Sequence, residues 1–458
     1  MKRKNAIVKV LLCIAFLLCS CSNNKGSPES AASAPVTDST ESSYTDSSQT
    51  DDSLMPETVY HKDRLSEIIS ETLGIIEQDS SFEIDESTVG KDIADMYDYA
   101  NRTGCFPVYK GADTEYYPMG EVAFEHILEE LEKAEDFIFL EYYTLNEGEM
   151  WGKIYDILKR KASEGVEVRV IYDGLINASD LPADFPQQLE QNGIRCLPYS
   201  FSGDGKNYDY NIRDHRKIIV IDGKVAFTGG INIADAYINV THEFGVWKDN
   251  LIKIKGNAVN SFTLMFLQMW NSCTDDDKIK EYLTDVSEDT GAEGYIMPFS
   301  ENPNDEYLVS KGFYMTMLKN ARDYVYIITP YLIPDEEFEN AIIEAAARGI
   351  EVKIYVPGTS DLAVAGTMTR SHYQPLLESG VRLFEYKKGF IHSKVFVSDD
   401  TKAIVGTVNI DNRSFVYDFE CGVYLYGKSA VAEVLAEFDD NEEDYVEVTL
   451  DNIDSFTG

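Results

Sequence analysis

Composition and charge already exclude several classes of partner. The chain has 458 residues, with 80 Asp and Glu against 40 Lys and Arg, so its formal net charge is −40 at pH 7. Nucleic acids are bound by basic surfaces that neutralise phosphates, so this balance argues against a nucleic-acid partner and against a nuclease. It also argues against adhesion to anionic lipid through charge alone.

The first 21 residues are typical of a secretory leader. Lys2-Arg3-Lys4 precedes a short apolar run that reaches Leu18, too short for a comfortable membrane span. The end of this run, Leu18-Cys19-Ser20-Cys21, resembles a bacterial lipobox. Residues 1–21 are therefore predicted to be a lipoprotein signal, with Cys21 acylated as the mature N-terminus. An ordinary signal peptide or an uncleaved anchor is the alternative.

Residues 22–100 are predicted to connect this leader to the folded body. Residues 22–52 have almost no large apolar side chain, which is typical of a flexible tether. From Leu54 to Tyr99 the chain stays acidic but has apolar residues at helical spacing, which predicts a helical lead-in. A lipid on Cys21 would then hold the protein to the membrane surface, at the extracytoplasmic face of a bacterial cell membrane.

Four cysteines remain after Cys21: Cys105, Cys196, Cys273 and Cys421. They could pair outside the cytoplasm, but Cys196 and Cys421 lie in apolar strands, so buried free thiols are the simpler interpretation. No spacing of His and Cys residues indicates a zinc site. Neither a metal nor another cofactor is predicted.

Strands and helices alternate from residue 101 onward, which indicates an α/β fold with a mixed or parallel sheet. In residues 101–285, we expect helices at 120–134 and 151–163, and strands at 137–143 and 166–172. In residues 286–427 the same order recurs, with helices at 312–321 and 336–347 and strands at 324–329 and 350–356. Two homologous halves are predicted to pack around a pseudo-two-fold axis. The acidic tail, 428–458, is predicted to be a solvated helix and strand.

One set of polar residues and glycines occurs twice, and every member recurs 177 positions later. The two copies are His215, Lys217, Asp222, Gly229 and Asn232, and then His392, Lys394, Asp399, Gly406 and Asn409. Glu243 and Glu420 stand at the same offset. A lone copy would be no more than a core histidine or a chance match, whereas the repeat without a slip indicates a site.

The residues between these positions explain their spacing. An apolar strand follows each histidine, and residues two apart on a strand share a face, so each lysine lies beside its histidine. A turn at Asp222 or Asp399 leads into a second strand, which returns Asn232 or Asn409 toward that pair. Pseudo-two-fold packing would bring the two His-Lys strands to face each other.

The paired HxKxxxxD motifs with a trailing Gly-x-x-Asn resemble the phospholipase D superfamily, and their flanks are similar to bacterial cardiolipin synthases. Those flanks include 139–144, 161–169, 214–218, 228–232, 247–249 and 329–334. The resemblance covers about residues 101 to 450. It implies two phospholipase D-like α/β sandwich halves, here behind a lipobox-like leader instead of the two membrane-spanning helices usual in such synthases.

The resemblance also implies a mechanism without metal. His215 would attack phosphorus to form a phosphohistidine, and His392 would act as the acid and then as the base. The groups expected to hold the non-bridging phosphate oxygens are Lys217, Lys394, Asn232 and Asn409. Glu243 and Glu420 are expected to accept from the Nδ1–H of each histidine. Asp222 and Asp399 complete the motifs, and either bracing the turns or touching substrate is open to them.

The implied function is that of a phosphatidyltransferase of the cardiolipin synthase type. Such an enzyme joins two molecules of phosphatidylglycerol, an anionic phospholipid, into cardiolipin and releases glycerol. A secreted phospholipase D that uses water as the acceptor is the alternative. A tethered lipid-binding protein without turnover is a third hypothesis, which two complete motifs disfavour. The oligomeric state stays open.

Overall fold

The computed structural model describes residues 62–72, 74–76, 86–103, 106–111, 113–199, 212–274, 278–284, 292–439 and 442–457. The predicted leader with Cys21, the tether and Cys105 lie outside these ranges. In the described part of the lead-in, α2 (Lys62–Thr72), α3 (Glu86–Val89) and α4 (Lys91–Thr103) are helical, as predicted.

The first sheet has seven strands in the order β2-β10-β8-β7-β3-β4-β5. They are β2 (Thr114–Tyr117), β3 (Phe137–Tyr142), β4 (Glu167–Asp173), β5 (Ile194–Tyr199), β7 (Lys217–Ile221), β8 (Val225–Gly229) and β10 (Leu251–Lys255). Strand β4 pairs in parallel with β3 and with β5, and all other neighbouring strands in this sheet are antiparallel. Helices α5 (Gly120–Lys133), α6 (Glu149–Glu164) and α8 (Phe185–Glu190) share an apolar core with its outer face.

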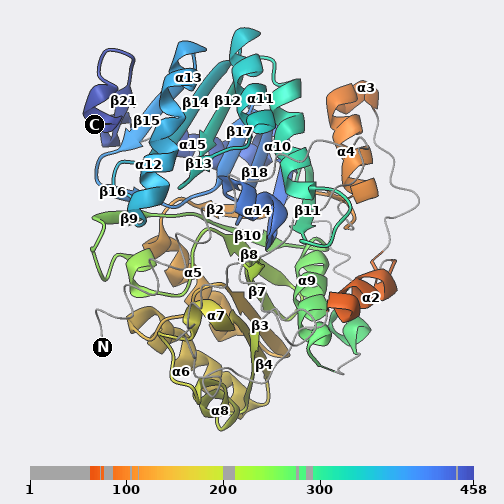
Figure 1. Cartoon of the computed structure of the whole chain (residues 1–458). Coiled ribbons are helices and arrows are strands. Elements are labelled where there is room, and N and C mark those ends of the chain that lie inside the picture. Colours follow the sequence, from red (N-terminus) through yellow and green to blue (C-terminus); the bar gives the residue numbers. More distant parts are fainter. Residues whose placement is uncertain are drawn as a thin grey trace, which may run out of the picture. The chain divides into compact units, whose positions relative to one another are not determined.

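The second sheet repeats this order as β11-β20-β18-β17-β12-β14-β15, with the same parallel and antiparallel pairs. These strands are β11 (Tyr295–Glu301), β12 (Tyr324–Ile328), β14 (Glu351–Pro357), β15 (Arg382–Tyr386), β17 (Val395–Ser398), β18 (Lys402–Gly406) and β20 (Asp418–Tyr426). Helices α10 (Val309–Asn320), α11 (Glu336–Ala347) and α13 (Tyr373–Glu378) cover its outer face (Figure 1). The predicted fold class, two homologous α/β halves, is confirmed.

The inner faces of the two sheets share one apolar core with α9 (Val259–Ser272) and α15 (Lys428–Asp439). The tail after residue 427 contains the expected helix, α15, and the expected strand, β21 (Tyr445–Val448), which pairs with β15. The prediction that this tail is solvated was wrong for the inner face of α15, whereas the outer face of that helix and residues 449–451 are exposed. Val431, Val434 and Phe438 form an apolar stripe at helical spacing, and α15 buries it in the shared core.

Two short parallel strand pairs cross between the halves. Strand β6 (Arg213–Asp214) pairs with β20, and β16 (Gly389–Ile391) pairs with β9 (Val246–Lys248). In both pairs, the segment just before a motif histidine lies against a strand of the other half. Any site built on these histidines therefore needs both halves.

The remaining described α-helices and strands are short. They are β1 (Tyr109–Lys110), which pairs with β11, α7 (Gly174–Asn177), α12 (Ala363–Ser371), α14 (Asn412–Val416), α16 (Asp454–Thr457), and the pair β13 (Leu332–Ile333) and β19 (Ile410–Asp411). Within the described ranges, no helix combines the length and apolar character that crossing a bilayer requires. Cys196 and Cys421 are free thiols, as expected, but only Cys421 is fully buried; Cys273 is also a free thiol. The exact limits of the two halves stay predictions.

Candidate active site

The two motif copies occupy equivalent places in the two sheets. His215 lies two residues before the central strand β7, and His392 lies three residues before the central strand β17. The hairpins β7–β8 and β17–β18 have the predicted strand-turn-strand form. The histidines are almost fully buried, with His215 6% and His392 5% exposed. Each is held by the other half, because His215 N donates to the Phe419 carbonyl at 3.0 Å and His392 N to the Lys248 carbonyl at 2.7 Å.

The His215 side chain is oriented by a carboxylate from the second half. Its Nδ1 lies 2.9 Å from both carboxylate oxygens of Glu420, to which the Thr407 hydroxyl also donates. Burial raises the pKa of Glu420, while the Lys217 ammonium and that hydroxyl oppose the rise. A carboxylate only accepts, so Nδ1 carries the hydrogen and Nε2 presents a lone pair.

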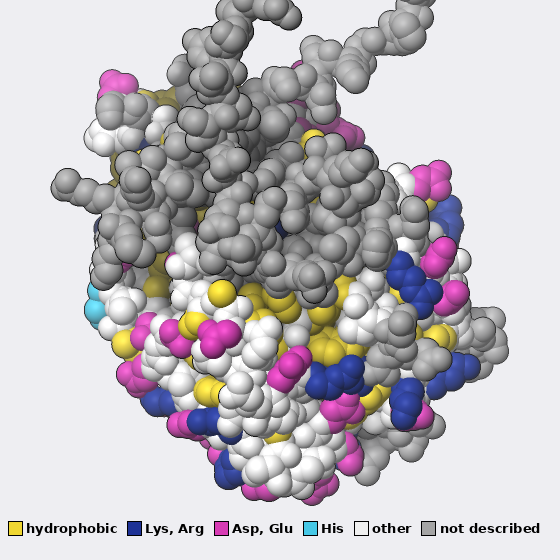
Figure 2. Space-filling view, turned by 60° about the horizontal axis from the view of Figure 1, so that its bottom comes forward, with side chains coloured by type: hydrophobic (Ala, Val, Ile, Leu, Met, Phe, Trp, Pro, Cys, Tyr) yellow, Lys and Arg dark blue, Asp and Glu magenta, His cyan; other side chains and the backbone are white. Residues whose placement is uncertain are grey.

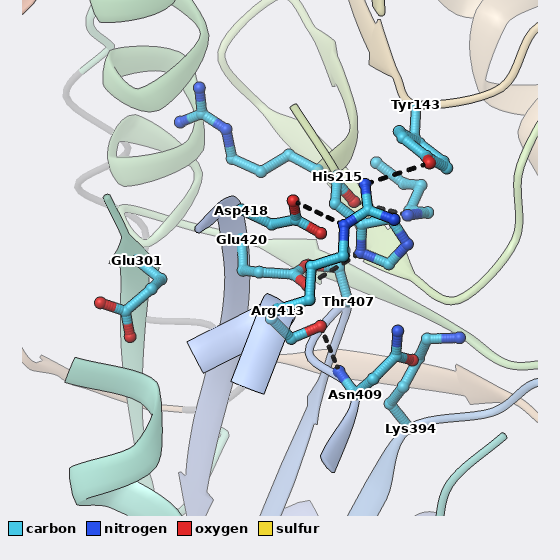
Figure 3. Close-up of polar contacts among 12 residues, drawn as sticks. Tyr143, His215, Glu301, Lys394, Thr407, Asn409, Arg413, Asp418 and Glu420 are labelled. Atoms are coloured by element: carbon cyan, nitrogen blue, oxygen red, sulfur yellow. Dashed lines mark hydrogen bonds and ion pairs between the residues drawn. The ribbon is translucent and has the colours of Figure 1, made fainter. Parts of the chain in front are cut away.

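Tyr143 and Arg413 lie on one side of the His215 ring (Figure 3). The ring of Tyr143 meets that of His215 edge-on at 4.8 Å. Arg413 Nη2 donates to the Tyr143 hydroxyl at 3.4 Å, and its Nε donates to Asp418 at 3.3 Å. The guanidinium therefore adds positive charge beside His215.

The second histidine is oriented by Asp249 and not by Glu243, which corrects the sequence prediction. His392 Nδ1 lies 2.7 Å from Asp249 Oδ2, whereas Glu243 is exposed. Strand register gives the reason. Leu251 pairs with Gly229 in the first sheet and Gly422 pairs with Gly406 in the second, so Asp249 and Glu420 both stand two residues before the paired position.

An insertion explains why constant spacing picked the wrong acid. Asp249 lies 20 residues after Gly229, whereas Glu420 lies 14 residues after Gly406. The first half therefore carries six extra residues before its acid, and the match at Glu243 is fortuitous. The signal that could have found Asp249 is its place just ahead of the apolar strand that begins at Leu251.

Both lysines lie fully inside the site, Lys217 at 0% and Lys394 at 1% exposure. Each ammonium donates to the main-chain carbonyl of its own histidine. Burial lowers the pKa of Lys217 to about 8 and that of Lys394 to about 7. The carboxylates of Glu420 and Asp249 oppose this fall and help to keep both groups charged.

The same burial favours neutral imidazoles. Burial lowers the pKa of His215 well below its usual value, and the ammonium groups of Lys217 and Lys394 lower it further. Burial, and then the Lys394 ammonium, lower the pKa of His392 to about 4, although Asp249 opposes this. The charges of each motif copy act on the other copy's histidine, so the structure brings the two copies together.

The two asparagines differ in what they contact. Asn232 Oδ1 accepts from Thr144 N at 3.1 Å, and its Nδ2 donates to the Tyr237 hydroxyl at 2.7 Å. The buried Oδ1 of Asn409 has no hydrogen-bond partner among the described residues. Both side chains follow the second strand of their hairpin, as predicted, and their part in binding phosphate stays a prediction.

Asp222 and Asp399 brace the sheets. The Asp222 carboxylate accepts main-chain N–H groups at 2.8–2.9 Å from the three residues 135–137, where β3 starts. Asp399 does the same for residues 322–324 at the start of β12 and also pairs with Lys402. Both lie at the strand end opposite the histidines. Of the two roles left open by the sequence, bracing is the one that the contacts support.

Comparisons with known proteins identify relatives of this chain. The family described as cardiolipin synthase, PLD-like domain, matches residues 127–270 and 314–441. An uncharacterized protein of Streptococcus mutans is 47% identical over 340 residues, 74% of each chain. The cardiolipin synthase of a Geobacillus species is 36% identical over 357 residues, covering 78% of this chain and 71% of its own. That of Alkalihalophilus pseudofirmus is 35% identical over 345 residues, covering 75% and 68%.

Among solved structures, the phosphatidylserine synthase of Haemophilus influenzae matches 80% of this chain and 93% of its own. The TM-score is 0.61 and the sequence identity 16%, so this likeness concerns the fold alone. The family match spans both motif copies and more than half of the chain. The chain therefore belongs to the cardiolipin synthase family of phospholipase D-like enzymes, whose substrates are phospholipids.

Proposed function

We propose that this protein transfers a phosphatidyl group from one phosphatidylglycerol to the terminal hydroxyl of a second, forming cardiolipin and releasing glycerol. One observation carries the proposal. Two buried histidines, from opposite halves, each have Nδ1 held by a carboxylate, at 2.9 Å for His215 and 2.7 Å for His392. Exchange of one phosphate ester for another needs a nucleophile and a group that moves protons, and this pair supplies both.

In the first step, His215 Nε2 attacks phosphorus of the donor. A phosphorus–nitrogen bond forms, the phosphorus–oxygen bond to glycerol breaks, and His392 gives its proton to the leaving oxygen. The nucleophile is assigned by similarity to the family. Glu420 stabilises the positive charge that develops on the His215 ring, because it accepts the Nδ1–H.

In the second step, the glycerol hydroxyl of the acceptor lipid replaces the glycerol that left. Neutral His392 takes the hydroxyl proton, the oxygen attacks phosphorus, and the phosphorus–nitrogen bond breaks. His215 and His392 return to their first states, and cardiolipin leaves. Water in place of the second lipid would give phosphatidic acid, the product of the alternative hydrolase.

The charges of the site fit these roles. Neutral His215 is the form that attacks, and its lowered pKa favours that form at neutral pH. His392 needs a proton although its pKa is about 4 in the free site. An anionic phosphate between the rings of His215 and His392 favours a protonated imidazole, so we expect substrate binding to raise the pKa of His392 and to protonate it. Lys217 and Lys394 would hold the non-bridging oxygens, with Asn409 as a further donor.

We also propose that a lipid on Cys21 anchors the protein at the extracytoplasmic face of the cell membrane. A covalent anchor supplies the membrane contact that a chain with a net charge of −40 would not gain from anionic lipid. The leader residues support this proposal by their sequence alone.

The test is to incubate the purified protein with labelled phosphatidylglycerol and to identify the products by mass. We expect cardiolipin and glycerol in equal amounts. Phosphatidic acid as the main product would show that the protein is a hydrolase and would contradict the proposed transferase. The double variant His215→Ala, His392→Ala is the control, and it should give neither product. Product formed equally by this variant would contradict the site itself.

A further inference from the structure

The two histidine–carboxylate pairs are held in different ways. Glu420 receives the Thr407 hydroxyl directly. The matching position of the first half, next to Gly229 as Thr407 is to Gly406, is Gly230. A Cβ built there would overlap the Asp249 carboxylate. No hydroxyl therefore holds Asp249 from this position, and the aspartate must be positioned by other means.

Those other means lie in the residues on either side of Asp249. The Lys248 carbonyl accepts the His392 N–H at 2.7 Å, and Asn250 Oδ1 accepts the Lys394 N–H at 3.3 Å. Asp249 uses one oxygen for His392 Nδ1 and the other for Asn250 N at 2.8 Å. The segment 248–250 therefore sets the position of His392, its carboxylate partner and the neighbouring lysine together.

A glutamate of the C-terminal helix α15 anchors this segment from behind. The side chain of Glu437 is fully buried, and its Oε1 lies 2.8 Å from Lys248 Nζ. The Tyr116 hydroxyl donates to its other oxygen. Burial raises the pKa of Tyr116 well above its usual value, the Glu437 carboxylate adds to the rise, and the amide of Asn250 opposes it. Glu437 thus contacts Lys248, the residue directly before Asp249, and also holds Tyr116.

This polar cluster occurs on one side of the pseudo-two-fold axis. By the strand register that makes Asp249 the counterpart of Glu420, the counterparts of Lys248 and Asn250 are Phe419 and Cys421. Neither can form an ion pair with a glutamate. On the His215 side, the Thr407 hydroxyl holds the carboxylate of Glu420 instead of such a cluster. Each of the two carboxylates is therefore positioned by a different kind of contact.

We infer that Glu437 is a positioning residue for the reaction: by pairing with Lys248 and accepting from Tyr116, it keeps Asp249 aligned with His392 Nδ1. The inference rests on the proposed function only in that His392 acts in turnover. It assigns to the acidic C-terminal helix a part in the site, although its residues contact no reacting atom.

The test compares Glu437→Gln with Glu433→Gln, which lies one turn earlier on α15, is exposed, and accepts from Tyr116 N at 2.8 Å. We expect Glu437→Gln to lower kcat by roughly 10-fold or more at unchanged KM, since a small misplacement of a catalytic group is costly. Glu433→Gln should stay within about twofold of the wild type, as surface substitutions do. Equal kcat values for the two variants would overturn the inference.

A spectroscopic measurement separates positioning from general stability and needs no substrate. The chain has six histidines, so ¹⁵N-histidine labelling gives few ring signals, and a His392→Asn variant assigns the one of interest. In the wild type, the ring proton of His392 should reside on Nδ1. In Glu437→Gln that preference should weaken, while Glu433→Gln keeps it. An unchanged His392 signal in Glu437→Gln would sink the inference whether or not cardiolipin is the product.

Glu437→Gln leaves the Lys248 ammonium buried without its partner, which can itself prevent folding. The double variant Lys248→Met, Glu437→Gln removes both charges and avoids that penalty. We expect it to fold and still to show the altered His392 signal and the reduced kcat. Wild-type values in this double variant would mean that the pair serves stability alone, and the inference would be wrong.

Discussion

The two histidines of the candidate active site combine deep burial with neighbouring groups of opposite charge. His215 and His392 are kept neutral by burial and by lysines, yet each donates from Nδ1 to a carboxylate that can stabilise a positive ring. This combination suits rings that are neutral at rest and become charged during turnover. It also makes the site sensitive to pH and to the leaving group, and both can be measured.

The leaving group should separate the roles of the two histidines. With phosphatidylglycerol, His392→Ala should slow formation of the covalent adduct by roughly 10²–10⁴-fold, the usual contribution of a general acid. A substrate with a nitrophenol leaving group needs little protonation, so it should restore adduct formation in His392→Ala but not in His215→Ala. The measurement is rapid-quench mass spectrometry of the protein. An adduct mapped to His392 in the wild type would reverse the assignment.

The lysines predict the alkaline limb of the pH profile. An ammonium is charged below its pKa, so phosphate binding weakens as pH rises through about 7 for Lys394 and about 8 for Lys217. We therefore expect kcat/KM for phosphatidylglycerol to fall between these values. The limb of kcat should lie higher, because bound phosphate raises both pKa values. His392, whose pKa is about 4 in the free site, must also take up a proton, so a separate limb near pH 4 belongs to this acid. A kcat/KM profile without a further fall between pH 7 and 8 would contradict the role of the lysines.

The metal-free mechanism has its own test, because one group of side chains could hold a cation. Ligand atoms of His215, Asp418 and Glu420 all lie within 4.8 Å of one another. The two carboxylates already accept from Arg413 and Thr407. We therefore expect turnover to survive EDTA without change. Loss of turnover that zinc or magnesium restores would contradict the mechanism.

At the scale of elements, the ends of the central hairpins place the polar groups of the site. Strands β7 and β17 start at the lysines or beside them, and β8 and β18 end at Gly229 and Gly406. The residue after each glycine then differs, Gly230 in one half and Thr407 in the other. The pseudo-symmetric frame is thus shared, while the means of holding each carboxylate is not.

Gly230 gives the element-scale prediction. A methyl group there would overlap the Asp249 carboxylate, so Gly230→Ala should displace Asp249 and lower kcat by roughly 10²-fold, as misplacement of a catalytic group does. Gly152→Ala in α6 is the matched control, because a Cβ there meets no neighbouring atom within 4 Å. It should leave kcat unchanged. Equal activity of both variants, measured on purified protein, would refute the steric argument.

At the scale of the whole molecule, an acidic protein is proposed to act on an anionic phospholipid. On the face that Figure 2 shows, basic side chains lie among acidic ones around a group of hydrophobic residues. The described surface there offers no continuous basic area for nucleic acid or for anionic lipid. Positive charge is instead concentrated inside the site, at Lys217, Lys394 and Arg413, where a single phosphate can use it.

Membrane attachment is therefore predicted to depend on Cys21. In bacterial cells, the wild-type protein should have the mass of a lipid-modified chain and remain with the membrane fraction. Cys21→Ala should lose the added mass and the stable attachment, because firm anchoring needs two acyl chains or more. Cys19→Ala, two residues away in the same leader, is the control and should keep both. An unmodified wild-type mass would exclude the lipoprotein hypothesis.

The amino-acid sequence by itself determines the α/β alternation, the two homologous halves, the family and the positions of both His-Lys-Asn sets. Such features depend on local periodicity and on constant spacing within each half, and both are visible along the chain. The hairpin that carries each set follows from the same patterns, because its strands and turn are contiguous.

The carboxylate partners depended on packing instead. Glu420 joins His215 across 205 residues, and Asp249 joins His392 across 143. An insertion of six residues moved the first acid away from its expected offset, so spacing pointed to the exposed Glu243. The position of Glu437 also depended on packing. The acidic sequence of α15 predicts a solvated helix, and only the packing of its apolar side chains into the shared core buries Glu437. Spacing along the chain cannot reveal contacts that strand register and the meeting of two sheets create.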